Sequence, residues 1–336
     1  MDIPLSVLDL VPAPAGIPSR QAFLNSIDLA RHAEELGYSR YWIAEHHNTD
    51  GFISAATTLV IGMIARETQS IRVGSGGIML PNHSPFHVAE HFLTLESMYP
   101  GRIDLGLGRA PGTDQLTALA LRRTRELLAA DDFPLQIELL QAFAGQIQWP
   151  DGHPFAKLRA TPSDVPLPPL WILGSSTFGA ELAARIGRGY AFAYHFSPQA
   201  APAAMHAYRT GFRPSEFMGR PHAILGVAVV AAETEEEADV LARAHDLMWL
   251  RIRRGERGAL PSAEEAAAYV FTDAELPLVA QSRQMLVWGS PDQVGRRLRE
   301  LKEKFNVDEF MITSHIADHE ARLRSYSLVT EAIRAA

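Results

Sequence analysis

Cysteine is absent from all 336 residues of the chain. This absence excludes disulfide bonds, thiolate metal sites and thiol nucleophiles together. No apolar run is long enough to span a bilayer, and the N-terminal residues MDIPLSVLDL lack the basic segment that opens a secretory signal. The net charge is −8 and no stripe of basic residues is present, which argues against nucleic acid or a membrane as a partner. We therefore expect a cytoplasmic protein.

Short β-branched or apolar runs alternate along the chain with longer segments of helical spacing. This alternation is typical of βα units arranged around a parallel sheet. Closure of eight such units predicts an α/β fold, a single (β/α)8 TIM-barrel domain over residues 1–336. The expected strands are Ile3–Leu10, Arg40–Glu45, Ile71–Met79, Arg102–Gly108, Leu170–Gly174, Tyr190–His195, Ala223–Val230 and Asp308–Thr313.

Two segments exceed what a minimal barrel needs, one after the fourth expected strand and one after the seventh. Residues 144–169 are rich in proline, glycine and aspartate, and we interpret them as a long excursion. Residues 255–284 are polar and separate two expected helices, which start near Thr234 and Ser290. Insertions of this length are often lids or binding loops, and a surface elaboration or subunit contact explains the segment equally well.

The second expected strand ends in Glu45-His46-His47, at the end of the barrel where βα loops carry active sites. Neighbouring strand residues point to opposite faces, so only one of the two imidazoles can face the barrel interior. A single imidazole suits proton transfer, because its ordinary pKa lies near neutral pH. The alternatives are a histidine satisfied within a loop network and a metal-dependent hydrolase built on all three residues. The second needs several ligands that converge on one point.

Glycines are concentrated in the third expected strand, which contains Gly74-Ser75-Gly76-Gly77. A glycine inside a strand marks either a bulge or the close approach of a ligand or another backbone. The pair Gly76-Gly77 at the barrel mouth therefore predicts a flat ligand lying on bare backbone or a packing bulge.

The fifth unit has the features of an anion site. Its strand runs through Gly174-Ser175-Ser176-Thr177-Phe178-Gly179 directly into an expected helix, and a helix N-terminus favours negative charge. Serine and threonine are also ordinary N-caps, so capping alone is the alternative. Arg109 ends the preceding strand, close enough to make a two-pronged hydrogen bond to a phosphate. The segment has neither the Gly-Lys-Ser/Thr signature of a Walker loop nor the spaced glycines of a dinucleotide fingerprint.

Taken in order, these motifs resemble the bacterial luciferase family of flavin-dependent monooxygenases, in particular its uncharacterised single-chain bacterial members. The similarity runs nearly end to end, and it rests on the order and spacing of several short motifs. These are Glu45-His46-His47, residues 73–81 (VGSGGIMLP), Ala89-Glu90, Pro100-Gly101-Arg102, Gly108-Arg109 and Gly289-Ser290-Pro291.

The resemblance implies that FMN binds at the C-terminal mouth of the barrel. It places the isoalloxazine ring over a non-prolyl cis peptide at Gly76-Gly77 and assigns proton transfer to His46. The phosphate-binding residues it implies are Arg109, Ser175, Ser176, Phe178 and Gly179.

Two departures from luciferase exclude carrying over light emission: Gly108 stands where luciferase has a reactive cysteine, and Ser175 stands where it has a glutamate. Three further residues near strand ends are secondary candidates for the substrate pocket: Asp9, Tyr194 and His195. Asp9 interrupts an apolar strand, and Tyr194 and His195 are equally consistent with packing at the mouth.

The function implied by the resemblance is a two-component monooxygenase. Reduced FMN arrives from a separate flavin reductase, reacts with O2 to a flavin C4a-peroxide, and the peroxide oxidises a small organic substrate. A homodimer is also expected from the family. One alternative keeps the barrel and uses the deazaflavin F420 for hydride transfer, and another is a flavin-binding protein without turnover.

Overall fold

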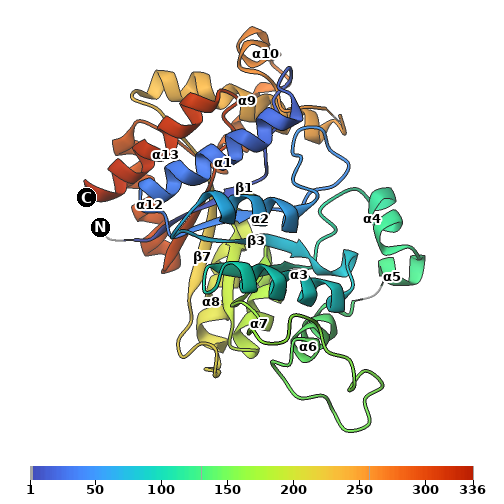
Figure 1. Cartoon of the computed structure of the whole chain (residues 1–336). Coiled ribbons are helices and arrows are strands. Elements are labelled where there is room, and N and C mark those ends of the chain that lie inside the picture. The colour runs from blue at the N-terminus through green and yellow to red at the C-terminus, as the bar shows by residue number, and fades with distance from the viewer. Residues whose placement is uncertain (1–2, 130, 257, 336) are drawn as a thin grey trace.

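The computed structural model describes residues 3–129, 131–256 and 258–335. Its centre is a closed barrel of parallel strands, which confirms the predicted (β/α)8 architecture (Figure 1). Neighbours follow chain order from β1 to β7, and β9 closes the ring by pairing with both β7 and β1. The barrel strands are β1 Leu5–Asp9, β2 Arg40–Ile43, β3 Arg72–Met79, β4 Ile103–Gly108, β5 Leu170–Gly174, β6 Gly189–Ala193, β7 Ala223–Ala231 and β9 Glu309–Thr313.

One further strand, β8 (Leu286–Gly289), was not predicted. It pairs with residues 228–231 of β7, which follow residues 224–227 paired with β9, and Ala228 is paired with both strands. The extra strand therefore lies outside the barrel ring and extends the sheet at the end of the second insertion.

Helices surround the barrel, as Figure 1 shows. None of those in the described part of the chain is both long and apolar enough to cross a bilayer. They are α1 Ser19–Glu35, α2 Thr57–Glu67, α3 Pro85–Met98, α4 Gln115–Arg122, α5 Arg125–Ala129, α6 Phe133–Phe143, α7 Thr177–Arg185, α8 Ala201–Gly211, α9 Glu235–Arg253, α10 Ala263–Ala268, α11 Leu276–Arg283, α12 Pro291–Phe305 and α13 His319–Arg334, with short 3-10 turns η1 Leu80–Asn82 and η2 Pro198–Ala200.

The two expected insertions differ in structure. Residues 145–169 contain no helix or strand and form the long loop that projects beside α6 in Figure 1. The polar segment 255–284 contains α10 and α11, for which no helix was predicted. Both short helices are tied to α9 by ion pairs, from Arg251 to Glu265 of α10 and from Asp246 to Arg283 of α11.

Charged side chains fill the N-terminal end of the barrel. The Asp104 carboxylate accepts hydrogen bonds from Arg40 at 2.7 Å, Arg72 at 2.6 Å and the Trp42 indole at 3.1 Å. Arg40 also contacts Glu309 at 3.0 Å. Burial would raise the pKa of Asp104, but Arg40 and Arg72 outweigh it and hold that pKa below its ordinary value. Ion pairs between buried carboxylates and arginines thus fill this end of the barrel. The opposite end is available for a binding site.

Candidate active site

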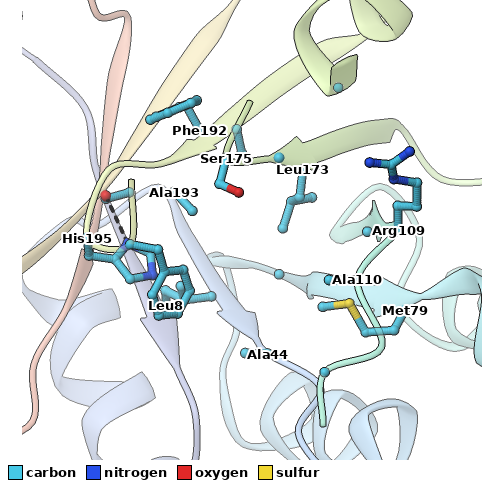
Figure 2. Close-up of a pocket in the computed structure, with 18 of the residues that line it drawn as sticks. Leu8, Ala44, Met79, Arg109, Ala110, Leu173, Ser175, Phe192, Ala193 and His195 are labelled. Carbon is cyan, nitrogen blue, oxygen red and sulfur yellow. Dashed lines mark hydrogen bonds between the residues drawn. The ribbon is translucent and has the colours of Figure 1, made fainter. Parts of the chain in front are cut away.

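A cavity of about 330 Å³ lies at the C-terminal ends of the barrel strands. This is the end at which barrel enzymes place their active sites. Arg109 and His195 lie on opposite sides of the cavity, with Leu173 and Ser175 between them (Figure 2). Most residues expected at the site belong to its wall: His46, Gly76, Arg109, Ser175, Ser176, Phe178, Gly179 and His195.

Arg109 marks one end of this cavity. Its guanidinium carbon lies 4.1 Å from the centre of the Phe178 ring, and one nitrogen lies 3.2 Å from the Asp131 carboxylate. The arginine side chain is 46% exposed, so this surface ion pair is weak and its partner is readily exchanged. The contact with Phe178 helps to position the guanidinium, and an anion in the cavity could replace Asp131 as its partner.

The first turn of α7 lies beside this arginine. Ser176 occupies the N-cap position in an extended conformation, but in the described structure its side chain makes no capping hydrogen bond. Capping alone therefore does not explain the hydroxyl-rich turn. The uncapped N–H groups at the helix start, the Ser175 and Ser176 hydroxyls and Arg109 together form a set of donors suited to a phosphate group.

The bond between Gly76 and Gly77 is a cis peptide, as the resemblance implied. The pairing of β3 with β4 shifts register between Ser75 and Ile78, so a bulge is present at the same place. A Cβ on Gly76 would lie 2.5 Å from the Leu8 side chain, and one on Gly77 would lie 2.7 Å from the Gly106 carbonyl oxygen. Close packing thus requires both glycines. Gly76 belongs to the cavity wall, and Gly77 faces β4, so a ring lying over both stays a prediction.

His46 belongs to the cavity wall, whereas the neighbouring His47 does not. The Nδ1 atom of His46 is buried and has no hydrogen-bond partner in the described structure. Burial lowers the pKa of His46 to about 4, against a smaller opposing effect of Glu45. The imidazole is therefore neutral near pH 7, with one nitrogen able to accept a proton and the other able to donate one.

Glu45 points away from this imidazole. Its carboxylate lies 2.8 Å from Nε2 of His47 and 2.9 Å from Nε2 of His83, and it accepts a hydrogen bond from the Met79 N–H at 3.0 Å. Burial would raise the pKa of Glu45, but His47 and His83 lower it to about 2. Glu45 and His47 thus bind each other rather than converge with His46. Among the described residues, no cluster of three or more His, Asp or Glu side chains has the arrangement of a metal site.

The structure does not place two of the secondary candidates in the cavity wall. Asp9 lies between Leu8 and Leu10, both of which belong to the wall, so its own side chain faces outward. Its carboxylate accepts hydrogen bonds from Arg322 and the Tyr41 hydroxyl, each at 2.7 Å. These two partners overcome the effect of burial and lower the pKa of Asp9, which links β1 to α13.

Tyr194 also lies outside the wall, in the turn that follows β6. Its neighbours Ala193 and His195 belong to the wall, and the tyrosine ring packs 5.7 Å from Phe305 of α12. His195 belongs to the cavity wall. Its Nδ1 lies 3.0 Å from the Gly226 carbonyl oxygen and must therefore donate a hydrogen there, which leaves Nε2 as an acceptor.

Residues 3–309 match the luciferase-like monooxygenase family. The uncharacterised protein YvbT of Bacillus subtilis (strain 168) is 44% identical over 330 residues, which cover 98% of this chain and 96% of that protein. The N-acetyl-S-alkylcysteine monooxygenase of the same strain is 32% identical over 339 residues and 99% of both chains. The crystal structure of apo-MsnO8 superposes with a TM-score of 0.90 at 38% identity, over 100% of this chain and 99% of that one.

More distant solved structures share the fold. The oxygenating constituent of 3,6-diketocamphane monooxygenase from Pseudomonas putida, in complex with FMN, has a TM-score of 0.72 at 16% identity, covering 99% of this chain and 98% of that one. An F420-dependent secondary alcohol dehydrogenase has a TM-score of 0.70 at 15% identity, over 99% and 100% of the chains. Three findings agree: the barrel has its cavity at the strand ends, the family match covers nearly the whole chain, and the relatives include monooxygenases. The chain belongs to the luciferase-like monooxygenase family and is an oxidoreductase.

Proposed function

We propose that this enzyme is an FMN-dependent monooxygenase that receives its flavin in the reduced form from a separate flavin reductase. The observation that carries the proposal is the pairing of two different ends in one cavity. One end holds Arg109 beside the uncapped start of α7, and the opposite side holds His195, which is close enough to affect the pKa of His46, whose buried Nδ1 has no partner in the described structure. FMN has the matching chemistry, with a phosphate at one end and a planar reactive ring at the other.

The residues of the phosphate end would act by binding and orienting. Arg109 and the N–H groups of the first turn of α7 would hold the phosphate, with Ser175 and Ser176 as additional donors. When bound, reduced FMN supplies the two electrons with which one atom of O2 enters the organic substrate while the other leaves as water. His46 is neutral and near the substrate side, so it would accept or donate the proton that this change requires.

F420 is the second candidate cofactor, because one of the distant structures binds it. F420 carries a long acidic tail, which would need several basic side chains at the mouth. Arg109 is the one basic side chain among the described residues of the wall. The cavity therefore favours a single phosphate over a long acidic tail. A binding titration with both cofactors tests this choice, and tighter binding of F420 would reverse it.

Replacement of Arg109 by alanine tests the assignment of the phosphate end. Loss of one charge-assisted hydrogen bond costs about 1.5–3 kcal/mol, so FMN affinity should fall roughly tenfold to hundredfold. Riboflavin lacks the phosphate, and its affinity should change less than about threefold. Quenching of flavin fluorescence measures both constants. Arg185→Ala, an exposed arginine at the other end of α7, is the matched control. Equal losses for FMN and riboflavin would refute the phosphate role.

His46→Gln tests the other end. The substitution keeps hydrogen bonding but removes the group that exchanges a proton near neutral pH, so FMN affinity should be retained and oxygenation impaired by about 10²-fold or more. Incorporation of ¹⁸O from labelled O2, with FMN kept reduced by an added reductase, measures turnover. Tight FMN binding by the unchanged enzyme without any ¹⁸O in a range of substrates would support a flavin-binding protein without turnover instead.

The proposal also includes a cytoplasmic location and a homodimer, neither of which follows from the cavity. Static light scattering of the purified chain gives its mass in solution, and a monomer at micromolar concentration would remove the dimer from the proposal. Fractionation of cells that express the chain tests the location.

A further inference from the structure

A second chamber of about 450 Å³ opens beside the cavity just described. The two share part of their walls, namely Leu10, His46, Gly112, His195 and Phe196. Because the shared residues include His46, a molecule in the second chamber would lie next to the same imidazole as the reactive end of the cofactor. The combined space lies in the range that a small ligand needs beside a cofactor.

The second insertion builds the outer wall of this chamber. Residues 258–261 belong to that wall, together with the end of α9. Leu260 is fixed to the N-terminal segment by two backbone hydrogen bonds, from Ala15 N–H at 2.9 Å and to the Ala13 carbonyl at 3.2 Å. This part of the insertion is therefore a built wall rather than a free surface loop, which favours the binding-segment interpretation of residues 255–284.

Rings and aliphatic groups dominate the surface of the chamber. Phe196 and Ile252 are 51% and 50% exposed, and Trp249 and Phe52 are partly exposed beside them. The Phe196 and Trp249 rings lie 6.2 Å apart at 73°, an edge-to-face arrangement that leaves ring faces available to a flat ligand. Large apolar groups that remain exposed together in a concave site indicate an apolar ligand, since its binding removes them from water.

The polar atoms at the inner end of the chamber belong to neutral imidazoles. Burial lowers the pKa of His315 to about 3 and that of His46 to about 4. The charged side chains of the wall already have partners or face solvent: Arg251 is paired with Glu265, Asp114 accepts hydrogen bonds from Asn48 and Thr117, and Glu256 is exposed. A charged group placed among the inner imidazoles would lose its hydration without gaining a counter-ion, which is costly.

We infer that this chamber binds the organic substrate, and that it selects an uncharged, largely apolar ring compound whose oxidised atom lies beside His46. Trp249, Ile252 and Phe196 are then specificity-determining residues. This inference rests on the proposed monooxygenase function, because it assigns the substrate side of the same site.

The test uses two probes of nearly equal shape, uncharged 2-naphthol and anionic 2-naphthoate. Equilibrium dialysis against the FMN-loaded protein near neutral pH gives both dissociation constants. 2-Naphthol should bind at least about tenfold more tightly than 2-naphthoate, and FMN should not compete with it. Equal or tighter binding of the anion, or displacement of FMN by 2-naphthol, would overturn the inference.

Two substitutions locate the probe. Ile252→Glu places a charge in the chamber wall at an exposed position, and Trp249→Ala removes the largest ring. Each should weaken 2-naphthol binding about tenfold or more while FMN affinity stays within about twofold. Val270→Glu is the matched control, because Val270 is 84% exposed on the same insertion and outside the chamber wall. Unchanged 2-naphthol binding in Ile252→Glu would refute the assignment.

The proposed function and the inferred substrate class can be tested separately. Arg109→Ala, which acts at the phosphate end, should leave 2-naphthol affinity unchanged. If 2-naphthol binds as described but no ¹⁸O enters any ring compound, the proposed function fails and the binding chamber stands. If ¹⁸O enters anionic substrates preferentially, the function stands and the inferred substrate class is wrong.

Discussion

The buried imidazoles around the two cavities make the stability of the fold depend on pH in a narrow window. Burial lowers the pKa of four histidines that lie close together: His46, His195, His245 and His315. In the unfolded chain an imidazole has a pKa of about 6.5. The unfolded state therefore binds more protons than the folded state below that pH, and the free energy of unfolding must fall as the pH decreases.

The magnitude follows from the two values that are defined, about 4 for His46 and about 3 for His315. At about pH 5 the unfolded pKa lies about 1.5 units above the solution pH, and each unit corresponds to about 1.36 kcal/mol. Each of these histidines thus removes about 2 kcal/mol of stability, or about 4 kcal/mol for the pair, between pH 7 and pH 5. His195 and His245 act in the same direction.

The carboxylates with lowered pKa do not obscure this window, and Asp246, whose pKa is raised by burial, acts in the opposite direction to the histidines. The buried acids with lowered pKa, Asp9, Glu45, Asp104 and Glu309, contribute stability that is present above their unfolded pKa values near 4. Their contribution is lost only when the pH falls further, through the folded values. Between about pH 6.5 and pH 5, the loss of stability comes from the histidines.

Guanidinium unfolding at about pH 7 and about pH 5, followed by tryptophan fluorescence, measures the difference. In His315→Gln the loss between the two pH values should be smaller by about 2 kcal/mol, whatever the variant costs at pH 7. His206→Gln, on the exposed surface of α8, controls for the substitution itself. An unchanged pH dependence in His315→Gln, or an NMR titration of His315 near pH 6.5, would refute the reasoning.

Two further predictions concern the scaffold. Asp104→Asn leaves the guanidinium groups of Arg40 and Arg72 without their shared carboxylate, so the free energy of unfolding should fall by about 3–5 kcal/mol. The control is Glu233→Gln, which breaks an exposed ion pair with Arg324 and should cost less than about 1 kcal/mol. Equal thermal shifts in these two variants would contradict this account of the buried ion pairs. Arg123 adopts a left-handed φ of 73° after α4, a conformation that glycine adopts without steric cost. Arg123→Gly should therefore raise the free energy of unfolding by about 0.5–1 kcal/mol. A lowered melting temperature would contradict this prediction.

Much of the barrel could be predicted because its strands are buried on both faces and therefore stand out as apolar runs. β8 could not be recognised in this way. It has four residues, follows a polar insertion and pairs only with β7, so neither length nor periodicity separated it from a loop. The helices α10 and α11 are short and exposed, and their sequence lacks an apolar stripe that would define a buried face.

Strand geometry predicts the direction of some side chains at the candidate site and not of others. Alternation along β1 separates Asp9 from Leu8 and Leu10 and so places the Asp9 side chain outside the wall, whereas Tyr194 lies in the turn after β6, where alternation predicts no direction. His315 was not predicted to lie at the site. Every second residue from Met311 of β9 onward faces the cavities, and this spacing includes His315. Trp249 carries no comparable signal, because its place depends on how α9 folds back over the mouth.

β7 pairs with two different strands, β9 and β8, along its length. The first part of the strand pairs with β9 and closes the ring, and the last part pairs with β8. Residues 232–285 therefore begin directly after β7 and end directly before β8, and these two strands are hydrogen-bonded to each other. A chain segment with both ends fixed tolerates changes of length, since each doubling costs only about 0.6 kcal/mol of closure entropy. If the proposed function holds, variants of this segment would change the wall proposed for the substrate, while the proposed phosphate donors, which directly follow β4 and β5, would stay in place. Grafting this segment between members of the family is the corresponding route to a new substrate range.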